Sequence, residues 1–447
     1  MKNITKYSIL IMLGLVLMSG CKKLDQVNTN PNLPLSSPPA PQFLSSELLI
    51  GYAMGSDMSR FSAIWTQQAV GVNRQAQLYT TYTVGNADFD APWGNLYQGM
   101  TNLNDMIITA QKAGNNYYVG VGKILMAYSL GASTDVWGDM PFSKAFQGVA
   151  NLQPAFDNQQ ALYTTMHQLC DDGIAAFALP AGKLVPGADD IIYGGDVTKW
   201  TAFAHALKAR FYLHTSKRNA GDLAKVQPEL VLAGVATGAT SNTFADAYIT
   251  FGNANNTAGP WYQFMQQRAG DITFAQGNLG TVMINTSDPR LAAYIDTTQN
   301  VLGSFYGGTT SPAQLVTGAE LYFIYAEVSL RNADKATAAT ASNNGALASV
   351  QAITGAAAPA GWTTSYASET AGTITLEKII NQKYLALFLN PECFADWRRT
   401  TFPTLVQAAG SSTTGIPHRF FYAETETERN SATPRGLQLT DHVWWDN

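Results

Sequence analysis

The chain has 447 residues, of which 46% are hydrophobic and 13% are charged, and its 27 basic and 32 acidic side chains give a net charge of −5. This mild acidity, without a basic stripe, argues against nucleic acid as a partner. The apolar share is ample for a core. A surface made of neutral polar and aromatic groups suits neutral polar ligands, with sugars foremost.

The chain opens with a secretion signal. Lys2 and Lys6 precede an apolar run of 14 residues, 7–20, and a membrane-spanning helix needs about 20 residues. A plain signal peptide with an incidental cysteine is one alternative. However, the Ser-Gly pair directly before Cys21 resembles a bacterial lipobox, in which the cysteine thiol is acylated. We therefore expect residues 1–20 to be a lipoprotein signal peptide and Cys21 to be the lipidation site.

The next segment, residues 21–42, is rich in Pro, Ser and Asn and lacks apolar periodicity. Such a composition buries too little apolar surface to fold, so we expect a flexible tether that holds a globular body away from a membrane. One acyl chain anchors a protein only marginally, and stable attachment therefore implies several chains on Cys21. The folded domain is expected over residues 43–447.

Apolar residues at steps of three and four predict helices along this domain. In the segment 196–218, the side chains that share one helical face are Trp200, Phe203, Leu207, Phe211 and His214. Thr198 is placed to cap the start of this helix. Further helices with the same periodicity are predicted over residues 117–133, 318–332 and 376–390. A shorter helix is expected to have Asp288 as its cap and Pro289 as its first residue.

Strand signals are few, and short strands are predicted only within residues 242–253 and 418–426. The loops between helices are long for a compact domain and lie at residues 66–87, 180–196, 252–287 and 353–373. Long loops on a rigid scaffold commonly carry binding sites. The expected fold class is mainly α, with tetratricopeptide-like helix pairs as the scaffold, long loops and few short strands. No clean repeat of about 34 residues is present.

No catalytic or metal-binding motif stands out in the sequence. Cys170 and Cys393 either pair in an oxidising compartment or remain as two buried free thiols. The five histidines form no HxH or HxxxH pair, so no metal site is predicted, although calcium held by loop carbonyls would leave no local pattern. Nucleophile-elbow and phosphate-loop patterns are absent, and the acidic residues show no pairing typical of a glycosidase. We therefore expect a protein that is not an enzyme and needs no cofactor.

A series of stretches, spread in order over most of the chain, carries a family resemblance. They are LDQVNTNPN, WGNLYQGMTNLNDMI, DVWGDMPFSKAF, DIIYGGDVTKWTAFAHALKARF, SDPRLAAYI, AELYFIYAEVSLRN, IINQKYLALFLNPECFADWRRTTFP and HVWWDN. Together they resemble the SusD/RagB outer-membrane lipoproteins of Bacteroidota, in particular the SusD-like branch. The resemblance implies tetratricopeptide-like helix pairs that support a loop-rich face. It also implies a nutrient-binding protein, not an enzyme, whose partner is a SusC-like TonB-dependent transporter.

The implied location is the outer membrane, with a lipid anchor and the protein facing the cell exterior. One feature departs from the family pattern. Surface export in this phylum is usually promoted by acidic residues directly after the cysteine, whereas Lys22 and Lys23 come first here and Asp25 only later.

Aromatic side chains on loops are the candidates for sugar binding, because the apolar face of a pyranose stacks on a ring. With 9 Trp, 20 Tyr and 20 Phe, most aromatic residues must be structural. The candidate ligand-binding residues are Tyr79, Tyr82, Asn73, Arg74, Trp261, Tyr262, Arg268, Asp271, Phe305 and Tyr306. For any one of them, packing in the core is an equal alternative. Structural roles are expected instead for Trp93, Tyr97, Trp200, Trp397, Arg398 and Arg399.

The function expected from these features is that of a lipid-anchored receptor, which captures an oligosaccharide or a peptide-like nutrient and delivers it to the transporter. Two alternatives share the same anchor. One is a secreted glycan-degrading enzyme, and the other is a structural subunit of the transporter without a ligand of its own.

Overall fold

The computed structural model describes residues 37–447. The predicted signal peptide, Cys21 and most of the predicted tether lie outside the described residues. The first described helix, α3, spans Pro39–Gly55, so residues 39–42 are helical and do not belong to the tether. Within the described part of the chain, no helix combines the length and the apolar character that crossing a membrane requires.

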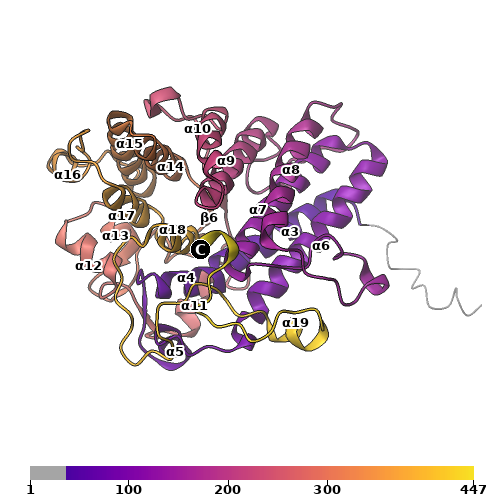
Figure 1. The fold of residues 1–447 in the computed structure, drawn as a ribbon, viewed down its shortest axis with the longest axis horizontal. Helices are drawn as coiled ribbons and strands as arrows, with labels where there is room; N and C mark the ends of the chain where they lie inside the picture. The colour runs from indigo at the N-terminus through magenta and orange to yellow at the C-terminus, as the bar shows by residue number, and fades with distance from the viewer. Residues whose placement is uncertain (1–36) are drawn as a thin grey trace, which may run out of the picture. The chain divides into compact units, whose positions relative to one another are not determined.

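Long helices form the scaffold, and successive ones pack as neighbours. They are α3, α6 (Asp90–Ala113), α7 (Asn116–Trp137), α8 (Gln159–Phe177), α9 (Val197–Thr215), α10 (Leu223–Leu232), α14 (Gly318–Arg331), α15 (Lys335–Thr354) and α17 (Leu376–Ala386). Helices α6 to α10 each contact the next one along the chain, α10 contacts α14, and α14 contacts α15. In Figure 1 these helices follow one another from α6 through α9 and α10 to α14 and α15. The predicted mainly α fold is confirmed.

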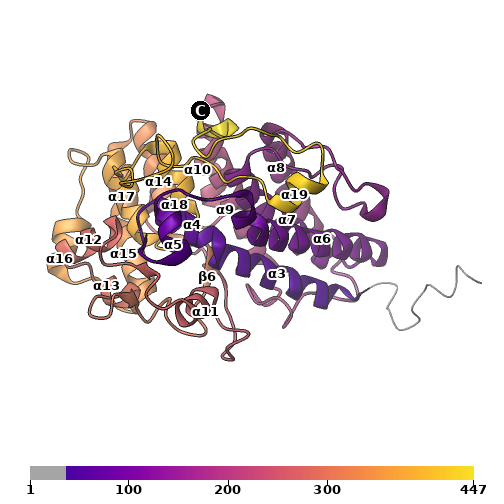
Figure 2. The same ribbon diagram turned by 90° about the horizontal axis from the view of Figure 1, so that it is seen from below.

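Among the shorter elements, α5, α11 and α19 lie below the row of long helices in Figure 1 and are also seen in Figure 2, whereas α16 packs beside α15 at the end of that row. The short helices are α4 (Asp57–Trp65), α5 (Arg74–Thr80), α11 (Pro260–Gln267), α12 (Asn278–Asn285), α13 (Leu291–Tyr294), α16 (Ala360–Tyr366), α18 (Glu392–Thr400) and α19 (Glu424–Arg429). Three antiparallel pairs of strands join them. They are β1 (Val70–Gly71) with β3 (Ile272–Thr273), β2 (Ala247–Ile249) with β6 (Ala313–Val316), and β4 (Ile295–Asp296) with β5 (Val301–Leu302).

Helix α9 confirms the predicted apolar face, since all five of its predicted face residues are buried. The predicted cap is wrong by two residues. The carboxylate of Asp196 accepts hydrogen bonds from the backbone N–H groups of Thr198 and Lys199, at 3.0 and 3.2 Å. Asp196 is therefore the N-cap, because its side chain reaches the unpaired donors of the first turn, in which Thr198 already lies.

Helix ends are the least accurate of the other sequence predictions. Helix α13 begins at Leu291, after the predicted first residue Pro289. The Asp288 carboxylate still accepts a backbone hydrogen bond, from Arg290 at 2.9 Å, and it also binds the Arg290 guanidinium. Helix α17 ends at Ala386, before the predicted end at residue 390.

Three of the four predicted long loops contain short elements. Residues 66–87 include β1 and α5, residues 252–287 include α11, β3 and α12, and residues 353–373 include α16. The predicted strand within residues 242–253 is β2, whereas the strand predicted at 418–426 does not form. Residues 418–423 are irregular up to the start of α19. Their backbone N–H groups make isolated hydrogen bonds to Leu439 and Val136, and not the repeated hydrogen bonds of a paired strand.

The two cysteines of the described residues do not pair. Cys170 on α8 and Cys393 on α18 are both free and buried. Burial raises the pKa of both thiols, so each stays protonated and behaves as a small apolar side chain.

Close packing of α8 on α7 depends on Gly173. A methyl group there would lie 2.6 Å from Cγ1 of Ile124 and 3.0 Å from the carbonyl oxygen of Gly120. We expect Gly173→Ala to lower the free energy of unfolding by about 1–3 kcal/mol, because a neighbouring side chain or helix must move. Urea denaturation followed by circular dichroism measures the effect.

The matched control is Gly94 on α6, where an added methyl group would meet nothing within 4 Å. Gly94→Ala is expected to raise the free energy of unfolding by about 0.5–1 kcal/mol, since alanine is the better helix former. Equal effects of the two substitutions would contradict the packing argument.

Candidate ligand-binding face

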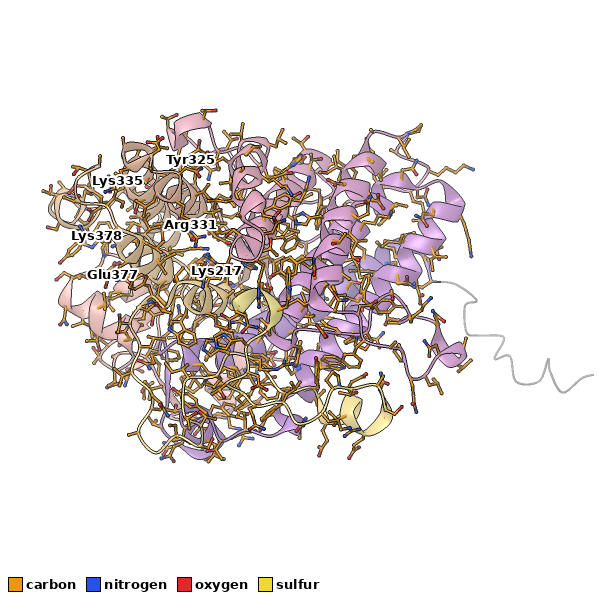
Figure 3. The ribbon with its side chains drawn as sticks, viewed as in Figure 1. Lys217, Tyr325, Arg331, Lys335, Glu377 and Lys378 are labelled. Atoms are coloured by element: carbon orange, nitrogen blue, oxygen red, sulfur yellow. The ribbon has the colours of Figure 1, made fainter. Side chains whose placement is uncertain are left out.

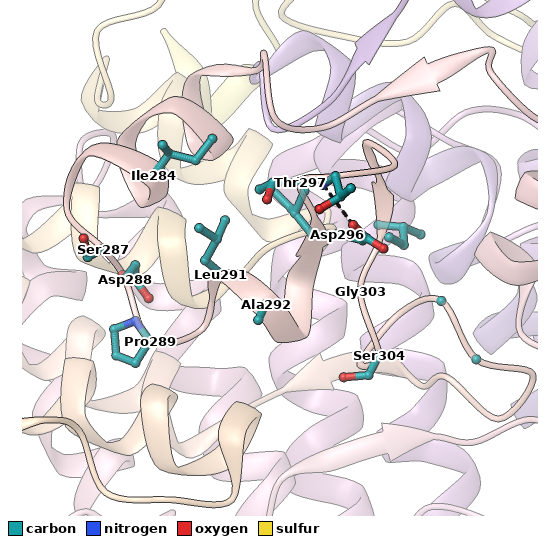
Figure 4. Close-up of a pocket in the computed structure, with 15 residues that line it drawn as sticks. Ile284, Ser287, Asp288, Pro289, Leu291, Ala292, Asp296, Thr297, Gly303 and Ser304 are labelled. Atoms are coloured by element: carbon teal, nitrogen blue, oxygen red, sulfur yellow. Dashed lines mark hydrogen bonds between the residues drawn. The ribbon is translucent and has the colours of Figure 1, made fainter.

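Two hollows lie among the short elements. The first, which we name the charged pocket, has a volume of about 120 Å³ and is lined by Asp57, Arg60, Arg74, Gln75, Ala76, Tyr79, Phe264, Arg268 and Asp271. The second, the glycine hollow, has a volume of about 960 Å³. It lies between α12, α13 and the glycine-containing turn after β5 (Figure 4).

The pairing of β1 with β3 builds one wall of the charged pocket, because it sets residues 70–74 beside residues 270–273. The Arg74 guanidinium contacts the buried Asp271 carboxylate, with Nε 3.0 Å from Oδ2 and Nη2 2.5 Å from Oδ1. Asn73 donates from Nδ2 to the carbonyl oxygen of Gly270 at 2.7 Å. The backbone of Arg74 has a φ of 49°, a region that is unfavourable for residues with a side chain. Such strain is concentrated at functional sites.

Helices α4 and α11 form the opposite wall. Arg60 makes an ion pair with Asp57, and its guanidinium carbon lies 4.6 Å from the centre of the Phe264 ring. Arg268, just after α11, is exposed and lines the same pocket. The pocket therefore holds three guanidinium groups and two carboxylates, and guanidinium donors suit sugar hydroxyl or carboxylate oxygens.

Tyr79 lines the charged pocket and belongs to the hydrophobic core. Its side chain is buried, and its ring centre lies 4.5 Å from that of Phe61. Its hydroxyl donates to Oδ1 of Asp88 at 3.3 Å. Burial, followed by the Asp88 charge, raises the pKa of Tyr79, so the hydroxyl remains a donor at neutral pH.

Three of the sequence-predicted ligand residues are packed in the core. Tyr82 is buried, and its hydroxyl accepts the backbone N–H of Ala408 at 3.3 Å. Trp261 is buried and donates from Nε1 to Oγ of Ser59 at 2.8 Å. Tyr306 is also buried, and its hydroxyl donates to the carbonyl oxygen of Phe388 at 2.8 Å. Their rings are therefore occupied by protein contacts.

The remaining two aromatic candidates are half-buried and lie apart. Tyr262 is on α11, whereas Phe305 packs on Tyr294 and Tyr306 at the edge of the glycine hollow. The structure thus brings Arg74, Tyr79, Arg268 and Asp271 together in one pocket with Asn73 beside it. Phe305 and Tyr306 belong to a separate region.

The glycine hollow is lined by a mixture of polar and aliphatic side chains with backbone, and none of its lining residues is aromatic. Oδ1 of Asp296 accepts the backbone N–H groups of Thr298 and Gln299 at 2.9 and 3.1 Å, which fixes the carboxylate at the rim (Figure 4). Gly303 allows the turn to approach α13, since a methyl group there would lie 2.4 Å from the carbonyl oxygen of Ala292. Such a surface can hydrogen-bond hydroxyl groups, but it offers no ring for stacking.

Sequence reasoning missed one exposed aromatic residue. Tyr52 on α3 is 39% exposed, and no other aromatic side chain of residues 37–447 is more than about a third exposed. Its hydroxyl donates to Oε1 of Gln263 on α11 at 3.3 Å. Aromatic residues on loops were the predicted ligand contacts, whereas Tyr52 lies on a helix. The available signal was Leu48, which is one turn earlier and also exposed, so that two apolar side chains share an outward face.

A family model described as starch-binding and associating with the outer membrane matches residues 39–310 and 306–423. The chain belongs to this SusD-like family. The resemblance seen in the sequence is thereby confirmed. Among curated proteins, no sequence matches the chain.

Solved structures share the fold of this SusD-like protein. A SusD/RagB family protein from Bacteroides thetaiotaomicron is 20% identical, with 92% of this chain and 99% of that chain covered and a TM-score of 0.71. A chitin-binding SusD homologue from Flavobacterium johnsoniae is 21% identical, with coverages of 91% and 98% and a TM-score of 0.72. A further chitin-binding protein is 20% identical, with coverages of 92% and 100% and a TM-score of 0.74.

Proposed function

We propose that this SusD-like protein binds oligosaccharides at the surface around α11, where Tyr52 and the charged pocket lie, with the glycine hollow as a separate second candidate site. The observation that carries the proposal is the match of a starch-binding family model to most of the chain. Two proteins of the same fold are named as chitin-binding, which points to the same class of ligand.

The chemistry of the face supports this class of ligand. The ring of Tyr52 offers a stacking surface, and its contact with Gln263 holds the ring beside α11. The exposed Arg268 supplies hydrogen-bond donors, and Asp296 supplies an acceptor at the glycine hollow. The binding face is largely preformed. We expect a modest affinity, because a receptor that delivers its ligand must also release it.

The receptor would be anchored by acyl chains on Cys21, face the cell exterior and deliver its ligand to a SusC-like TonB-dependent transporter. The predicted lipoprotein signal and the description of the family as associating with the outer membrane support this assignment. In this proposal the protein binds its ligand without chemical turnover, as a starch-binding family implies.

Tyr52→Ala is expected to weaken binding of the best starch or chitin oligosaccharide about tenfold or more, because the stacking surface is lost. Calorimetry with ligands chosen by native affinity gels measures the change. Tyr52→Phe keeps the ring and loses only the hydroxyl contact with Gln263. It is expected to bind within about threefold of the wild type.

Two further variants locate the ligand on the face. Arg268→Ala removes an exposed donor from the charged pocket, and Ala292→Trp fills the glycine hollow. Lys335→Ala, at the exposed start of α15 (Figure 3), is the control and is expected to bind normally.

The results of this panel also test the alternatives. Hydrolysis of a bound glycan would favour the enzyme. A lack of detectable binding to every glycan, together with co-purification with the transporter, would favour the structural subunit. Binding of peptides alone would contradict the oligosaccharide ligand and retain the receptor.

A further inference from the structure

A cluster of two histidines and one carboxylate lies near the C-terminus, formed by residues that the proposed glycan face does not use. Nδ1 of His418 lies 2.6 Å from Oδ2 of Asp446, and Nδ1 of His442 lies 3.1 Å from the same oxygen. The two imidazole centres are 3.9 Å apart. One potential ligand atom from each of the three residues lies within 4.8 Å of the other two.

Backbone contacts hold the cluster in place. The backbone N–H of His418 donates to the carbonyl oxygen of Leu439 at 2.7 Å, which brings the segments that carry the two histidines together. Nη1 of the buried Arg398 donates to the carbonyl oxygen of His418 at 2.9 Å. Asp446 ends the short 3₁₀ helix η5 (Trp444–Asp446). The three side chains therefore converge without a change of backbone.

The carboxylate of Asp446 is incompletely paired, since only its Oδ2 contacts the two histidines. Its side chain is completely buried, and Oδ1 has no hydrogen-bond partner within the described residues. A buried carboxylate oxygen without a partner is unfavourable, because its hydration is lost without replacement. Arg398 and Lys217 act on Asp446 electrostatically. However, Nη1 of Arg398 is directed to the carbonyl oxygens of Asp135 and His418.

We propose that His418, His442 and Asp446 bind a divalent transition-metal ion, with Zn²⁺ as the best match. Imidazole nitrogen and carboxylate oxygen are ordinary zinc ligands, and three protein ligands leave one position for water. In tetrahedral zinc sites the bonds are about 2.0–2.1 Å, so ligand atoms lie about 3.3 Å apart. The two nitrogen–oxygen contacts, at 2.6 and 3.1 Å, need to open by less than about 1 Å, and each Nδ1 must be free of its proton.

Exposure gives the metal a way in. The side chain of His442 is 42% exposed and that of His418 is 21% exposed, whereas Asp446 is fully buried behind them. An ion arriving from solvent would meet the imidazoles first and the carboxylate last. Bound there, it would link residues 442–446 to the segment around residue 418.

A second trio, Asp135, His214 and Glu392, is a useful contrast. It is fully buried beside a cavity of only about 30 Å³. Its groups are already paired, since His214 contacts both carboxylates and Arg210 contacts Glu392. This trio is an internal charge network, whereas the C-terminal cluster has an unpaired oxygen and access to solvent.

Calorimetry of the full chain in detergent with ZnCl₂, near pH 7.5, tests the proposal. One Zn²⁺ per chain is expected, and His442→Ala is expected to weaken binding at least about tenfold. Asp441→Asn is the matched control. It removes a half-buried neighbouring carboxylate that is not a ligand, and it is expected to bind within about threefold of the wild type.

Two measurements separate loss of the site from loss of the fold. The zinc-free His442→Ala variant is expected to unfold at the wild-type temperature, and Asp446→Asn is expected to lose zinc as well. Co²⁺ bound to the wild type is expected to show the strong visible absorption of a tetrahedral site. Equal zinc binding by the wild type and His442→Ala, or no binding at about 1 mM zinc, would overturn the proposal.

Discussion

Replacing Glu327 with glutamine is expected to lower the free energy of unfolding by about 3 kcal/mol at pH 7. Glu327 is buried on α14 and accepts Nη1 and Nη2 of Arg399 at 2.8 and 2.9 Å. Arg331, one turn further along α14 (Figure 3), contacts Oε1 of Glu327 at 2.6 Å. The neutral amide of glutamine would leave these guanidinium groups without their counter-charge.

The effect of Glu327 has a defined pH dependence. Burial opposes ionisation, but Arg399 and Arg331 outweigh it and lower the pKa of Glu327 from 4.5 to about 2. A carboxyl group whose pKa is lowered by folding stabilises the fold fully at pH values above its pKa in the unfolded chain, 4.5. This stabilisation is lost as the pH falls through the pKa in the folded protein, about 2. At about 1.4 kcal/mol for each pH unit, the difference between wild type and Glu327→Gln is expected to shrink by about 3 kcal/mol over this range.

Denaturant unfolding of both proteins at several pH values measures this difference. The control is Lys378→Ala, which breaks the surface ion pair with Glu369, 2.8 Å long, at a site visible in Figure 3. Solvent screens such a pair, so Lys378→Ala is expected to lower the free energy of unfolding by less than about 1 kcal/mol. Equal losses in the two variants would contradict the argument.

Glu327 belongs to a buried network that joins three helices. Arg399 on α18 also contacts Asp396 at 2.7 Å, and Lys383 on α17 contacts Asp396 at 2.7 Å. A buried ion pair adds little stability relative to an apolar pair of the same shape. Removing one partner is different, because a buried charge is left without compensation. The network therefore fixes how α14, α17 and α18 meet.

The sequence predicted the local half of this network. Arg399 was expected to have a structural role, and its partner Asp396 is only three residues away on the same helix. Glu327 is distant in sequence and was not considered. The same limit applies to the charged pocket, where Arg74 and Asp271 were both proposed but their direct contact depends on the pairing of β1 with β3. Contacts between distant segments leave no local pattern.

Side-chain direction was the second limit. Trp261 and Tyr306 lie in segments that were rightly expected to connect the long helices, yet both rings point into the core. A short helix such as α11 has too few turns for an apolar face to be recognised. The long, strongly periodic helices α7, α9 and α14 were predicted correctly because their apolar residues repeat over several turns. Tyr52 was overlooked because helices were assigned to the scaffold.

The alkaline side of the stability profile is expected to depend on His214. This residue on α9 is buried, with Nε2 2.8 Å from Oε1 of Glu392 and Nδ1 3.4 Å from Oδ2 of Asp135. The hydroxyl of Tyr163 lies 3.0 Å from Nδ1, and Trp445 stacks on the ring. Burial opposes the charged form, but Glu392 and Asp135 outweigh it and raise the pKa of His214 to about 9.

A histidine with a raised pKa stabilises the fold fully below its unfolded pKa of 6.5, and this stabilisation is lost as the pH rises through about 9. We therefore expect His214→Gln to lose about 3 kcal/mol more at pH 6 than at pH values above 9. Urea denaturation of both proteins from pH 6 to 9.5 measures the difference between them, so that other titrating groups cancel. A difference that stays constant with pH would contradict the charged state of His214.

His167, on the neighbouring helix α8, is the matched control because its environment has the opposite effect. Burial, followed by the charge of Lys208, lowers the pKa of His167 from 6.5 to about 4. The folded protein therefore favours the neutral form of His167. The free energy of unfolding falls only as the pH drops below 6.5, where the unfolded chain takes up the proton first. The effect of His167→Gln is therefore expected to be independent of pH between 6.5 and 9.5, where that of His214→Gln changes most. Two histidines on adjacent helices would then respond oppositely to pH, because two carboxylates outweigh burial at His214, whereas burial, reinforced by the charge of Lys208, prevails at His167.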